Sequence, residues 1–345
     1  MKTCPKCHTE NTVDSRFCQN CGYGLLEVQG EPDDPYLGRT FAGKYLVQQV
    51  LGAGAMGKVY LAEHLALGRP ICIKILHPHL AEDKSLTKRF HREARAASRL
   101  NHPNSIQVID FGQSEDGVLY IAMEYVPGID LRRIIKRDFP LPTPRIIRML
   151  GQVLSALEEA HGQGVIHRDL KPENIMIGDS RAEQDHVKVL DFGIAKIQEP
   201  GPEGGTLTVA GIVCGTPEYM APEQARGDPL DPRVDLYAAG IILYQMLSGE
   251  LPFKADSALA TVTKHLTEQP IPPHVRRPDL SVDMRLEAIC LRAMSKDREQ
   301  RYPSALAMKK DLESVSWGTD PSVSAPLYSK LHVVGLPVLQ ARIHS

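Results

Sequence analysis

The chain has 345 residues, of which 42% are apolar and 24% charged, and its 40 Lys and Arg against 42 Asp and Glu leave a formal net charge of −2. This balance argues against a protein that mainly binds nucleic acid, because a phosphate backbone needs an excess of Lys and Arg. The length suits two units, or one large domain with a small appendage, and the longest apolar-rich stretch, Leu236–Leu247, has 12 residues, fewer than the roughly 20 that cross a bilayer.

The chain begins with a cysteine cluster: four of the seven cysteines form two Cys-x-x-Cys pairs with ten residues between them. Zn²⁺ prefers four such thiolates in a tetrahedron, and the metal would supply the folding energy that so short a segment cannot obtain from a core. The predicted zinc ligands are Cys4, Cys7, Cys18 and Cys21. Residues 4–8 also match a haem attachment motif, which needs export, and a redox pair would need a βαβ unit. Because the N-terminus has no apolar leader, we expect a cytoplasmic protein.

The rest of the chain divides into a β-rich part and a helical part. Residues 25–44 are rich in Gly, Pro and Asp without a period, which predicts a linker. The predicted elements after it are a β-rich hairpin over Tyr45–Ala62, strands at Ile71–Leu76, Ser105–Phe111 and Val118–Tyr125, and helices at Leu86–Leu100, Arg145–Gln163, Val234–Leu247, Ala258–Thr267 and Met284–Ala293. We therefore expect an α+β fold with segments 1–24 (metal-binding), 25–44 (linker), 45–313 (main domain) and 314–345 (irregular tail).

A glycine loop lies within the first predicted hairpin. Residues 52–59 read G-x-G-x-x-G-x-V, a weak signal alone because dinucleotide-binding folds share these glycines. In those folds a helix follows the glycines, whereas here residues 58–62 continue as a strand. The glycines therefore predict a β-hairpin whose backbone lies over phosphates.

Further motifs follow in a fixed order: Lys74 in ICIK, Glu93 in HREA, His167–Asn174 as HRDLKPEN, Asp191-Phe192-Gly193, and Ala221-Pro222-Glu223. Together with the glycine loop they form the signature set of protein kinases. From Gly52 to about Arg301 the chain resembles the eukaryotic-like serine/threonine protein kinases of bacteria, and its first 24 residues resemble short zinc ribbons. The resemblance implies a bilobal protein-kinase fold and transfer of the γ-phosphoryl group of ATP to Ser/Thr hydroxyls of protein substrates.

The resemblance also implies a role for each catalytic residue. Lys74 would contact the α- and β-phosphates, and Glu93 would hold its ammonium in place. Asp169 would orient the substrate hydroxyl, while Lys171 would neutralise the γ-phosphate. The implied Mg²⁺ ligands, which are oxygen donors as this hard ion requires, are Asn174 and Asp191.

The implied ATP site lies between the glycine loop and a hinge. Its residues are Leu51, Gly52, Ala53, Gly54, Ala55, Met56, Gly57, Lys58, Val59, Cys72, Lys74, Met123, Glu124, Val126, Asp130 and Met176. Met123 has the gatekeeper position, the backbone of Glu124 and Val126 faces the purine, and Asp130 has the position of a ribose-binding acid. Cys72 replaces the family's usual Ala, and its thiol is either a feature of the adenine site or a small apolar core residue.

Other matching positions are structural or regulatory. In the family, Thr216 bonds to the catalytic Asp and Lys, Glu223 pairs with Arg301, and Asp235 braces the catalytic loop. The Pro- and Gly-rich stretch between Gly193 and Ala221 contains two threonines, one or the other of which we expect to be autophosphorylated in trans, within a transient homodimer, and to pair with Arg168. These threonines are Thr206 and Thr208, and the alternative is that they are solvated loop residues.

Two other functions compete with an active kinase. A pseudokinase scaffold usually lacks the Lys or one of the catalytic and metal-binding acids, whereas Lys74, Asp169, Asn174 and Asp191 are all present. A regulatory binding protein acting through the zinc ribbon is the other alternative. The ribbon's net charge of about +1 gives no footprint for nucleic acid, so we expect it to contact a regulatory protein.

Overall fold

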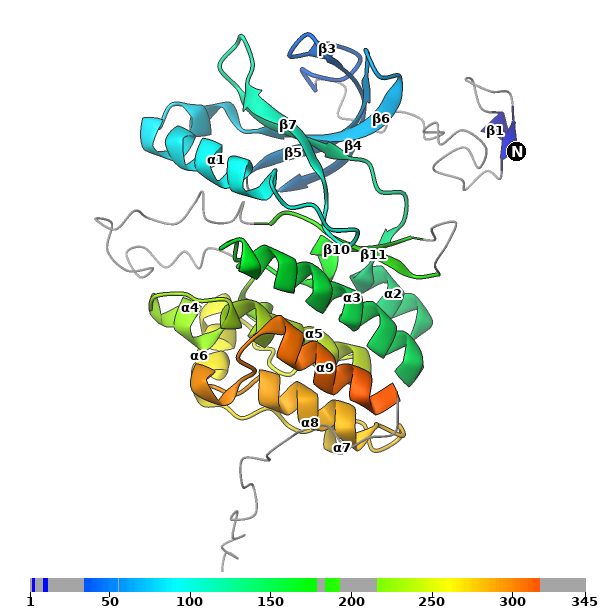
Figure 1. Cartoon of the computed structure of the whole chain (residues 1–345), viewed down its shortest axis with the longest axis vertical. Coiled ribbons are helices and arrows are strands. Elements are labelled where there is room, and N and C mark those ends of the chain that lie inside the picture. Colours follow the sequence, from blue (N-terminus) through cyan, green and yellow to red (C-terminus); the bar gives the residue numbers. More distant parts are fainter. Residues whose placement is uncertain are drawn as a thin grey trace, which may run out of the picture.

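The computed structural model describes residues 2–3, 9–11, 34–54, 56–178, 184–192 and 216–316. Most of these residues form a β-rich N-terminal lobe and a helical C-terminal lobe, as Figure 1 shows. This confirms the predicted α+β bilobal architecture. None of the helices in these ranges is long and apolar enough to cross a membrane.

The N-terminal lobe is built on one antiparallel sheet with strand order β3-β4-β5-β6-β8-β7. Its strands are β3 (Thr40–Phe41), β4 (Tyr45–Gly54), β5 (Gly57–His64), β6 (Arg69–Leu76), β7 (Val108–Gln113) and β8 (Leu119–Glu124). Side chains alternate between the two faces of a strand, so Ile71, Ile73 and Ile75 of β6 are buried in one core cluster. Cys72 and Lys74 therefore face the other side of the sheet, toward the cleft.

One helix, α1 (Lys84–Ala97), packs on this lobe after the short 3-10 turn η1 (Pro78–Ala81). Asp83 caps α1 by accepting hydrogen bonds from the backbone N–H groups of Ser85 and Leu86 at 2.7 and 3.2 Å, which explains why the helix begins two residues before the predicted start. Its apolar stripe, which includes Leu86 and Phe90, is buried. The predicted last three residues lie in a turn instead.

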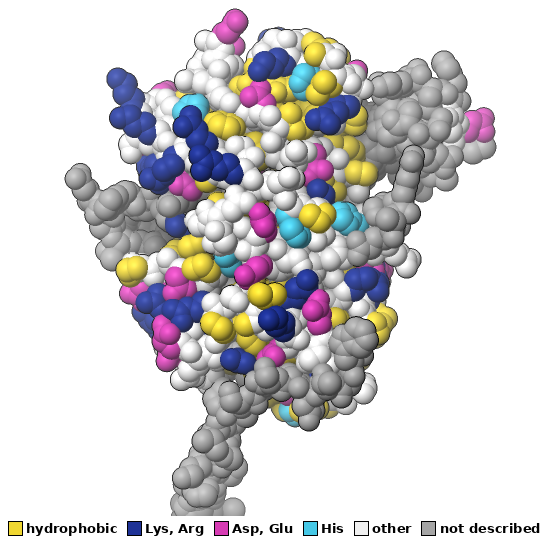
Figure 2. Space-filling view, viewed as in Figure 1, with side chains coloured by type: hydrophobic (Ala, Val, Ile, Leu, Met, Phe, Trp, Pro, Cys, Tyr) yellow, Lys and Arg dark blue, Asp and Glu magenta, His cyan; other side chains and the backbone are white. Residues whose placement is uncertain are grey.

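The C-terminal lobe surrounds α5 (Arg233–Ser248), whose nearly continuous apolar sequence is buried on all sides. The other helices are α2 (Leu131–Asp138), α3 (Thr143–Gly162), α4 (Pro222–Arg226), α6 (Ala258–Thr267), α7 (Pro273–Arg276), α8 (Met284–Ala293) and α9 (Ala305–Ser316). A small antiparallel sheet lies where the lobes meet, formed by β9 (Ile129–Asp130), β10 (Ile175–Gly178) and β11 (His186–Val189). Figure 2 shows positive and negative side chains interspersed over the visible face of this lobe.

At two of the predicted segment boundaries, described residues outside the predicted main domain pack with the lobes. Within the segment predicted as a linker, Asp34 accepts hydrogen bonds from Lys58 and Tyr60, and the ring of Tyr36 lies 5.4 Å from that of Phe41. Residues 34–44 therefore belong to the N-terminal lobe, held by aromatic packing that their Gly- and Pro-rich composition concealed. The main domain also extends past residue 313, because α9 continues to Ser316.

The N-terminal segment contributes one described feature, an antiparallel pairing of β1 (Lys2–Thr3) with β2 (Glu10–Asn11). The four predicted zinc ligands, Cys4, Cys7, Cys18 and Cys21, lie outside the described residues, as do Ala55, Thr206, Thr208 and the chain after Ser316.

Candidate active site

The glycine loop joins β4 to β5, and its glycines differ in their surroundings. A Cβ added to Gly52 or Gly54 would meet no heavy atom within 4 Å, so the backbone there is open to a ligand. A Cβ on Gly57, where φ is +155°, would lie 2.1 Å from the carbonyl oxygen of Ile75 on β6. Gly57 is thus required for packing the sheet, whereas the first two glycines leave room above the cleft.

Lys74 on β6 reaches across the cleft to Asp191. Its Nζ donates a 2.8 Å hydrogen bond to Asp191 Oδ2. Burial alone would raise the pKa of Asp191, but the charge and hydrogen bond of Lys74 outweigh it, so the pKa lies below the usual value. Asp191 adopts the left-handed region, at φ +57°, and the next residue, Phe192, is buried against the ring of His167 at 5.1 Å between centroids.

Glu93 does not pair with Lys74 in this structure, in contrast to the role implied for it. It lies on the buried face of α1, and its Oε1 accepts a 3.0 Å hydrogen bond from Nε of the neighbouring Arg92. The ammonium of Lys74 has the carboxylate of Asp191 as its partner instead. Of the two acids, Glu93 and Asp191, only Asp191 is therefore hydrogen-bonded to Lys74.

The catalytic loop, residues 167–174, directly precedes β10 and brings the side chains of Asp169, Lys171 and Asn174 together. Lys171 Nζ donates to Asp169 Oδ2 at 2.7 Å and to Thr216 Oγ1 at 2.8 Å. Asn174 Nδ2 donates to the backbone oxygen of Asp169 at 2.8 Å. The single ammonium group of Lys171 thus connects Asp169 of the loop to Thr216. Residues 216–223 are called the substrate-side segment below.

Asp235 on α5 fixes the position of the catalytic loop through hydrogen bonds to its backbone. Its carboxylate accepts 2.8 Å hydrogen bonds from the backbone N–H groups of His167 and Arg168 and from Nε2 of His161. Burial alone would raise its pKa, but these hydrogen bonds and the charge of His161 lower it, so the buried carboxylate stays ionised. Arg168 has a left-handed backbone at φ +69°, a strained conformation that the surrounding hydrogen bonds fix.

The substrate-side segment is tied to the lobe by a buried ion pair. Arg301 donates two hydrogen bonds to the carboxylate of Glu223, at 2.6 and 2.8 Å, and its guanidinium lies over the ring of Tyr237 at 4.8 Å. Such a two-pronged pair fixes both position and direction, so η4 (Pro217–Tyr219) and α4 have a defined place beside the catalytic loop.

The residues expected around the purine lie on several elements. Met123 on β8 is buried and is the register partner of Cys72 on β6. Burial, followed by the charge of Asp191, raises the pKa of the Cys72 thiol to about 12, so it stays protonated like a small core residue. Glu124 already accepts a hydrogen bond from Lys188 at 2.7 Å, and Asp130 caps α2 by accepting from the backbone of Arg133.

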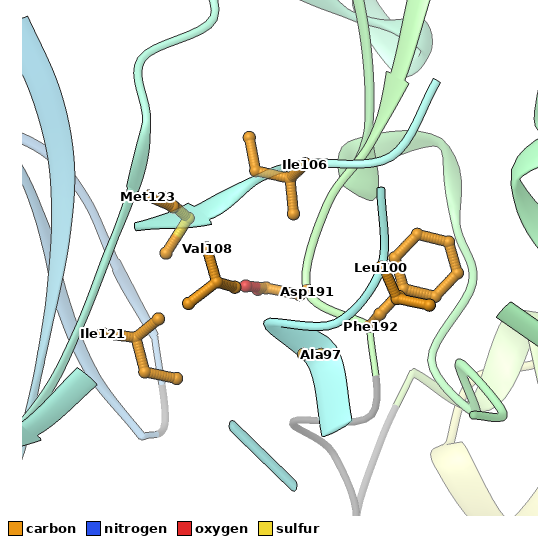
Figure 3. Close-up of a pocket in the computed structure, with 8 residues that line it drawn as sticks. All are labelled: Ala97, Leu100, Ile106, Val108, Ile121, Met123, Asp191 and Phe192. Carbon is orange, nitrogen blue, oxygen red and sulfur yellow. The ribbon is translucent and has the colours of Figure 1, made fainter. Parts of the chain in front are cut away.

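An apolar cavity of about 10 Å³ lies behind Met123, between the sheet, α1 and Asp191. A cavity of this volume is about the smallest that can hold one water molecule. Figure 3 shows the side chains of Met123, Ile121 and Val108 directed toward it. Its full lining is Ala97, Leu100, Ile106, Val108, Ile121, Met123, Asp191 and Phe192.

Sequence reasoning missed two residues that position the catalytic loop. His161, on the last turn of α3, bonds to Asp235, and Gln224 donates to the backbone oxygen of Arg168 at 2.8 Å. Neither belongs to a motif quoted above, and no local spacing signals them, because each acts across elements that meet only in the folded chain.

Comparison with known proteins agrees with this geometry. The protein kinase domain family matches residues 45–311, and the zinc-ribbon domain family matches residues 3–25. The chain therefore belongs to the protein kinase family. It is 56% identical over 296 residues to the serine/threonine-protein kinase pkn3 of Myxococcus xanthus, a match that covers 86% of this chain and 54% of that protein.

Two further proteins are similar over much of the chain. The serine/threonine-protein kinase PknB of Mycobacterium tuberculosis is 43% identical over 281 residues, covering 81% of this chain and 44% of that protein. The crystal structure of the Mycobacterium tuberculosis PknI kinase domain is 32% identical with a TM-score of 0.62, covering 80% of this chain and 98% of that one. The chain thus spans about half the length of the curated relatives it matches.

Proposed function

We propose that this chain is an ATP-dependent serine/threonine protein kinase of the bacterial cytoplasm. The observation that carries the proposal is the bridge that Lys171 forms between Asp169 and Thr216. It places an acid that can orient a hydroxyl beside a cation that can neutralise phosphate, next to the segment that would hold a protein substrate. The names of the two relatives, both serine/threonine-protein kinases, support the same residue type.

The chain's own groups account for most of the chemistry. Phosphoryl transfer needs positioning and charge neutralisation more than covalent help. We assign Lys74 to the α- and β-phosphates, Asp169 to the acceptor hydroxyl and Lys171 to the γ-phosphate. The purine, ribose and phosphates would lie against the hinge, Asp130 and the open glycines of the loop.

The site also suits Mg²⁺, which would supply further charge neutralisation when bound. The carboxylate of Asp191 is ionised, and Asn174 offers an amide oxygen, both of which are hard oxygen donors. Within the described ranges no three His, Cys, Asp or Glu side chains gather as a metal site. We therefore infer that Asn174 and Asp191 hold the ion together with phosphate oxygens and water.

The test is to incubate the purified chain with labelled ATP, Mg²⁺ and a protein substrate, and to compare it with Asp169→Asn. We expect phosphate on Ser and Thr of the substrate, and a loss of rate of about 10²–10⁴-fold in the variant, because a positioned acid–base group contributes that much. ATP binding, measured by fluorescence titration, should be retained because Lys74 and Asp191 are unchanged. Equal turnover in the variant would reject the assignment.

A second proposal concerns control by the segment before Thr216. We propose that Thr206 or Thr208 is autophosphorylated in trans and that the phosphate pairs with Arg168, because a phosphate adds about −1.5 to −2 charges and strong acceptors. The double variant Thr206→Ala/Thr208→Ala should therefore phosphorylate an exogenous substrate more slowly than the parent. Undiminished activity, with no phosphate mapped to either residue in the parent, would contradict this mechanism and leave the kinase assignment intact.

The N-terminal segment has a proposed role of its own. The zinc-ribbon family match over residues 3–25 supports a single Zn²⁺ held by Cys4, Cys7, Cys18 and Cys21. Because the ribbon would be small and independent of the active site, we propose that it contacts a regulatory protein.

A further inference from the structure

One face of α1 and of the turn after it carries an unbroken row of cations. The row, called the α1 basic stripe below, consists of Lys84, Lys88, Arg92, Arg95 and Arg99. The successive spacings are four, four, three and four residues, which places all five on the same side of a helix. All five are exposed, whereas Leu86, Phe90 and Ala94 of the same helix are buried. Figure 2 shows dark-blue side chains gathered over this part of the N-terminal lobe.

Among the residues that the structure describes, the stripe has little acidic compensation. Arg92 pairs with Glu93. The other four cations form no ion pair with any residue in the part of the chain that the structure describes. Exposed arginines of the other lobe do have partners: Arg132 pairs with Glu173, and Arg137 pairs with Asp138.

Folding stability does not account for this arrangement. Like charges four residues apart destabilise a helix, and the stripe contains three such pairs: Lys84 with Lys88, Lys88 with Arg92, and Arg95 with Arg99. Lys84 is also the first residue of α1, the end where the helix dipole disfavours a cation. A binding partner with negative charge would remove this repulsion.

We propose that the α1 basic stripe is a docking surface for an acidic segment of a partner protein. The stripe extends over about 22 Å at 1.5 Å per residue, which suits a short run of Asp and Glu. Nucleic acid fits less well, because single strands bind to exposed aromatic rings and the one aromatic residue of α1 besides histidine, Phe90, is buried. Stable binding to a lipid surface combines such a charge cluster with an exposed apolar face, and the apolar face of α1 is already packed in the lobe core.

The test is a binding measurement on the full chain with a fluorescein-labelled poly-glutamate peptide of about 16 residues, long enough to span the stripe. The stripe variant changes Lys84, Lys88, Arg95 and Arg99 to Gln. The matched control changes four exposed cations elsewhere, none of which is in a described ion pair, to Gln: Arg69, Lys136, Lys254 and Lys310. Both variants lose four positive charges. A difference in binding between them therefore reports the position of the charges and not the net charge of the protein.

We expect the wild type and the control to bind the peptide with an affinity that falls as salt rises, and the stripe variant to bind at least about tenfold more weakly. The stripe variant should melt at or above the temperature of the wild type, since it removes like-charge repulsion, which excludes unfolding as the cause. Absence of binding by the wild type would overturn the proposal. So would an equal loss in the control, or tighter binding of a single-stranded DNA of equal charge.

Discussion

At the scale of single residues, the partners of a buried group decide its charge more than its burial does. Asp191 and Asp235 both lie where desolvation alone would raise their pKa, yet both pKa values are lowered, by Lys74 in one case and by His161 and backbone N–H groups in the other. A metal ligand and a brace for strained backbone both need an ionised carboxylate. His265 shows the opposite outcome, because its ring is buried beside the cation of Lys296, and both effects lower its pKa.

His265 predicts an acid-sensitive contribution to stability. Its Nδ1 shares a 2.9 Å hydrogen bond with the hydroxyl of Tyr237, and burial, then the charge of Lys296, lowers its pKa to about 3. The unfolded chain, with a pKa of about 6.5, binds the proton first as the pH falls, so this residue's contribution to the free energy of unfolding declines below pH 6.5. The loss amounts to about 2 kcal/mol by pH 5.

Urea unfolding at pH 7 and pH 5 checks this. The wild type should lose more stability between the two pH values than His265→Gln does, by about 2 kcal/mol. His79→Gln, on the exposed surface, serves as the control and should keep the wild-type pH dependence. If all three proteins show the same dependence, other groups control the acid response.

At the scale of elements, the glycine loop predicts a contrast between two neighbouring substitutions. In Gly57→Ala the new methyl group would meet a backbone oxygen of β6 at 2.1 Å, and backbone atoms cannot rotate away, so the free energy of unfolding should fall by about 1–3 kcal/mol. In Gly52→Ala the methyl group enters open space, and the change should stay within about 0.5 kcal/mol. Thermal melting of both variants without nucleotide tests this, and equal melting temperatures would contradict the packing argument.

Several elements with a long periodic pattern were predicted, whereas α9 and the shortest elements were not. The helices at Ala258–Thr267 and Met284–Ala293 have their predicted bounds, because several turns of apolar spacing and a capping Ser or Asp mark them. No prediction covered β9, which has two residues, or α7, which has four, since such lengths contain less than two periods. Their existence depends on neighbouring elements rather than on local sequence.

The candidate site shows the same division. The motifs place Lys74, Asp169 and Asp191 on their elements because each motif is local, and the family resemblance supplies their order. The partner of Lys74 could not be read from them, because the choice between Glu93 and Asp191 depends on how α1 is set against the sheet. Arg92 belongs to the α1 basic stripe and donates a hydrogen bond to the neighbouring Glu93. A residue on the exposed face of α1 therefore contacts the buried acid that was expected to bind Lys74.

At the scale of the whole molecule, the chain entering the N-terminal lobe is anchored earlier than its composition suggests. Asp34 has a fully buried side chain that pairs with Lys58 of the glycine-loop strand at 3.0 Å. Burial alone would raise its pKa, but Lys58, the backbone of Tyr36 and the hydroxyl of Tyr60 lower it. The aromatic rings of Tyr36, Phe41 and Tyr60 then pack edge to face at 5.4 and 6.1 Å between centroids. We therefore propose that residues 34–44 belong with the N-terminal lobe, which would put the boundary between independent units before residue 34 rather than at residue 44.

This boundary predicts different results for two truncations. A chain starting at Asp34 should lose the proposed zinc, from one ion per chain to none by metal analysis, and keep the melting temperature of the kinase lobes. A chain starting at Tyr45 should melt at a lower temperature, because it lacks the buried partner of Lys58 and the Phe41 ring. Because Lys58 is partly exposed, losing Asp34 should cost less than the roughly 3–5 kcal/mol of a fully buried pair, whereas truncating a buried aromatic residue costs about 3–5 kcal/mol. The full-length variant Asp34→Ala separates the two terms and should account for the ion-pair part of the loss. If both truncated chains have the melting temperature of the intact chain, residues 34–44 do not contribute to the stability of the N-terminal lobe.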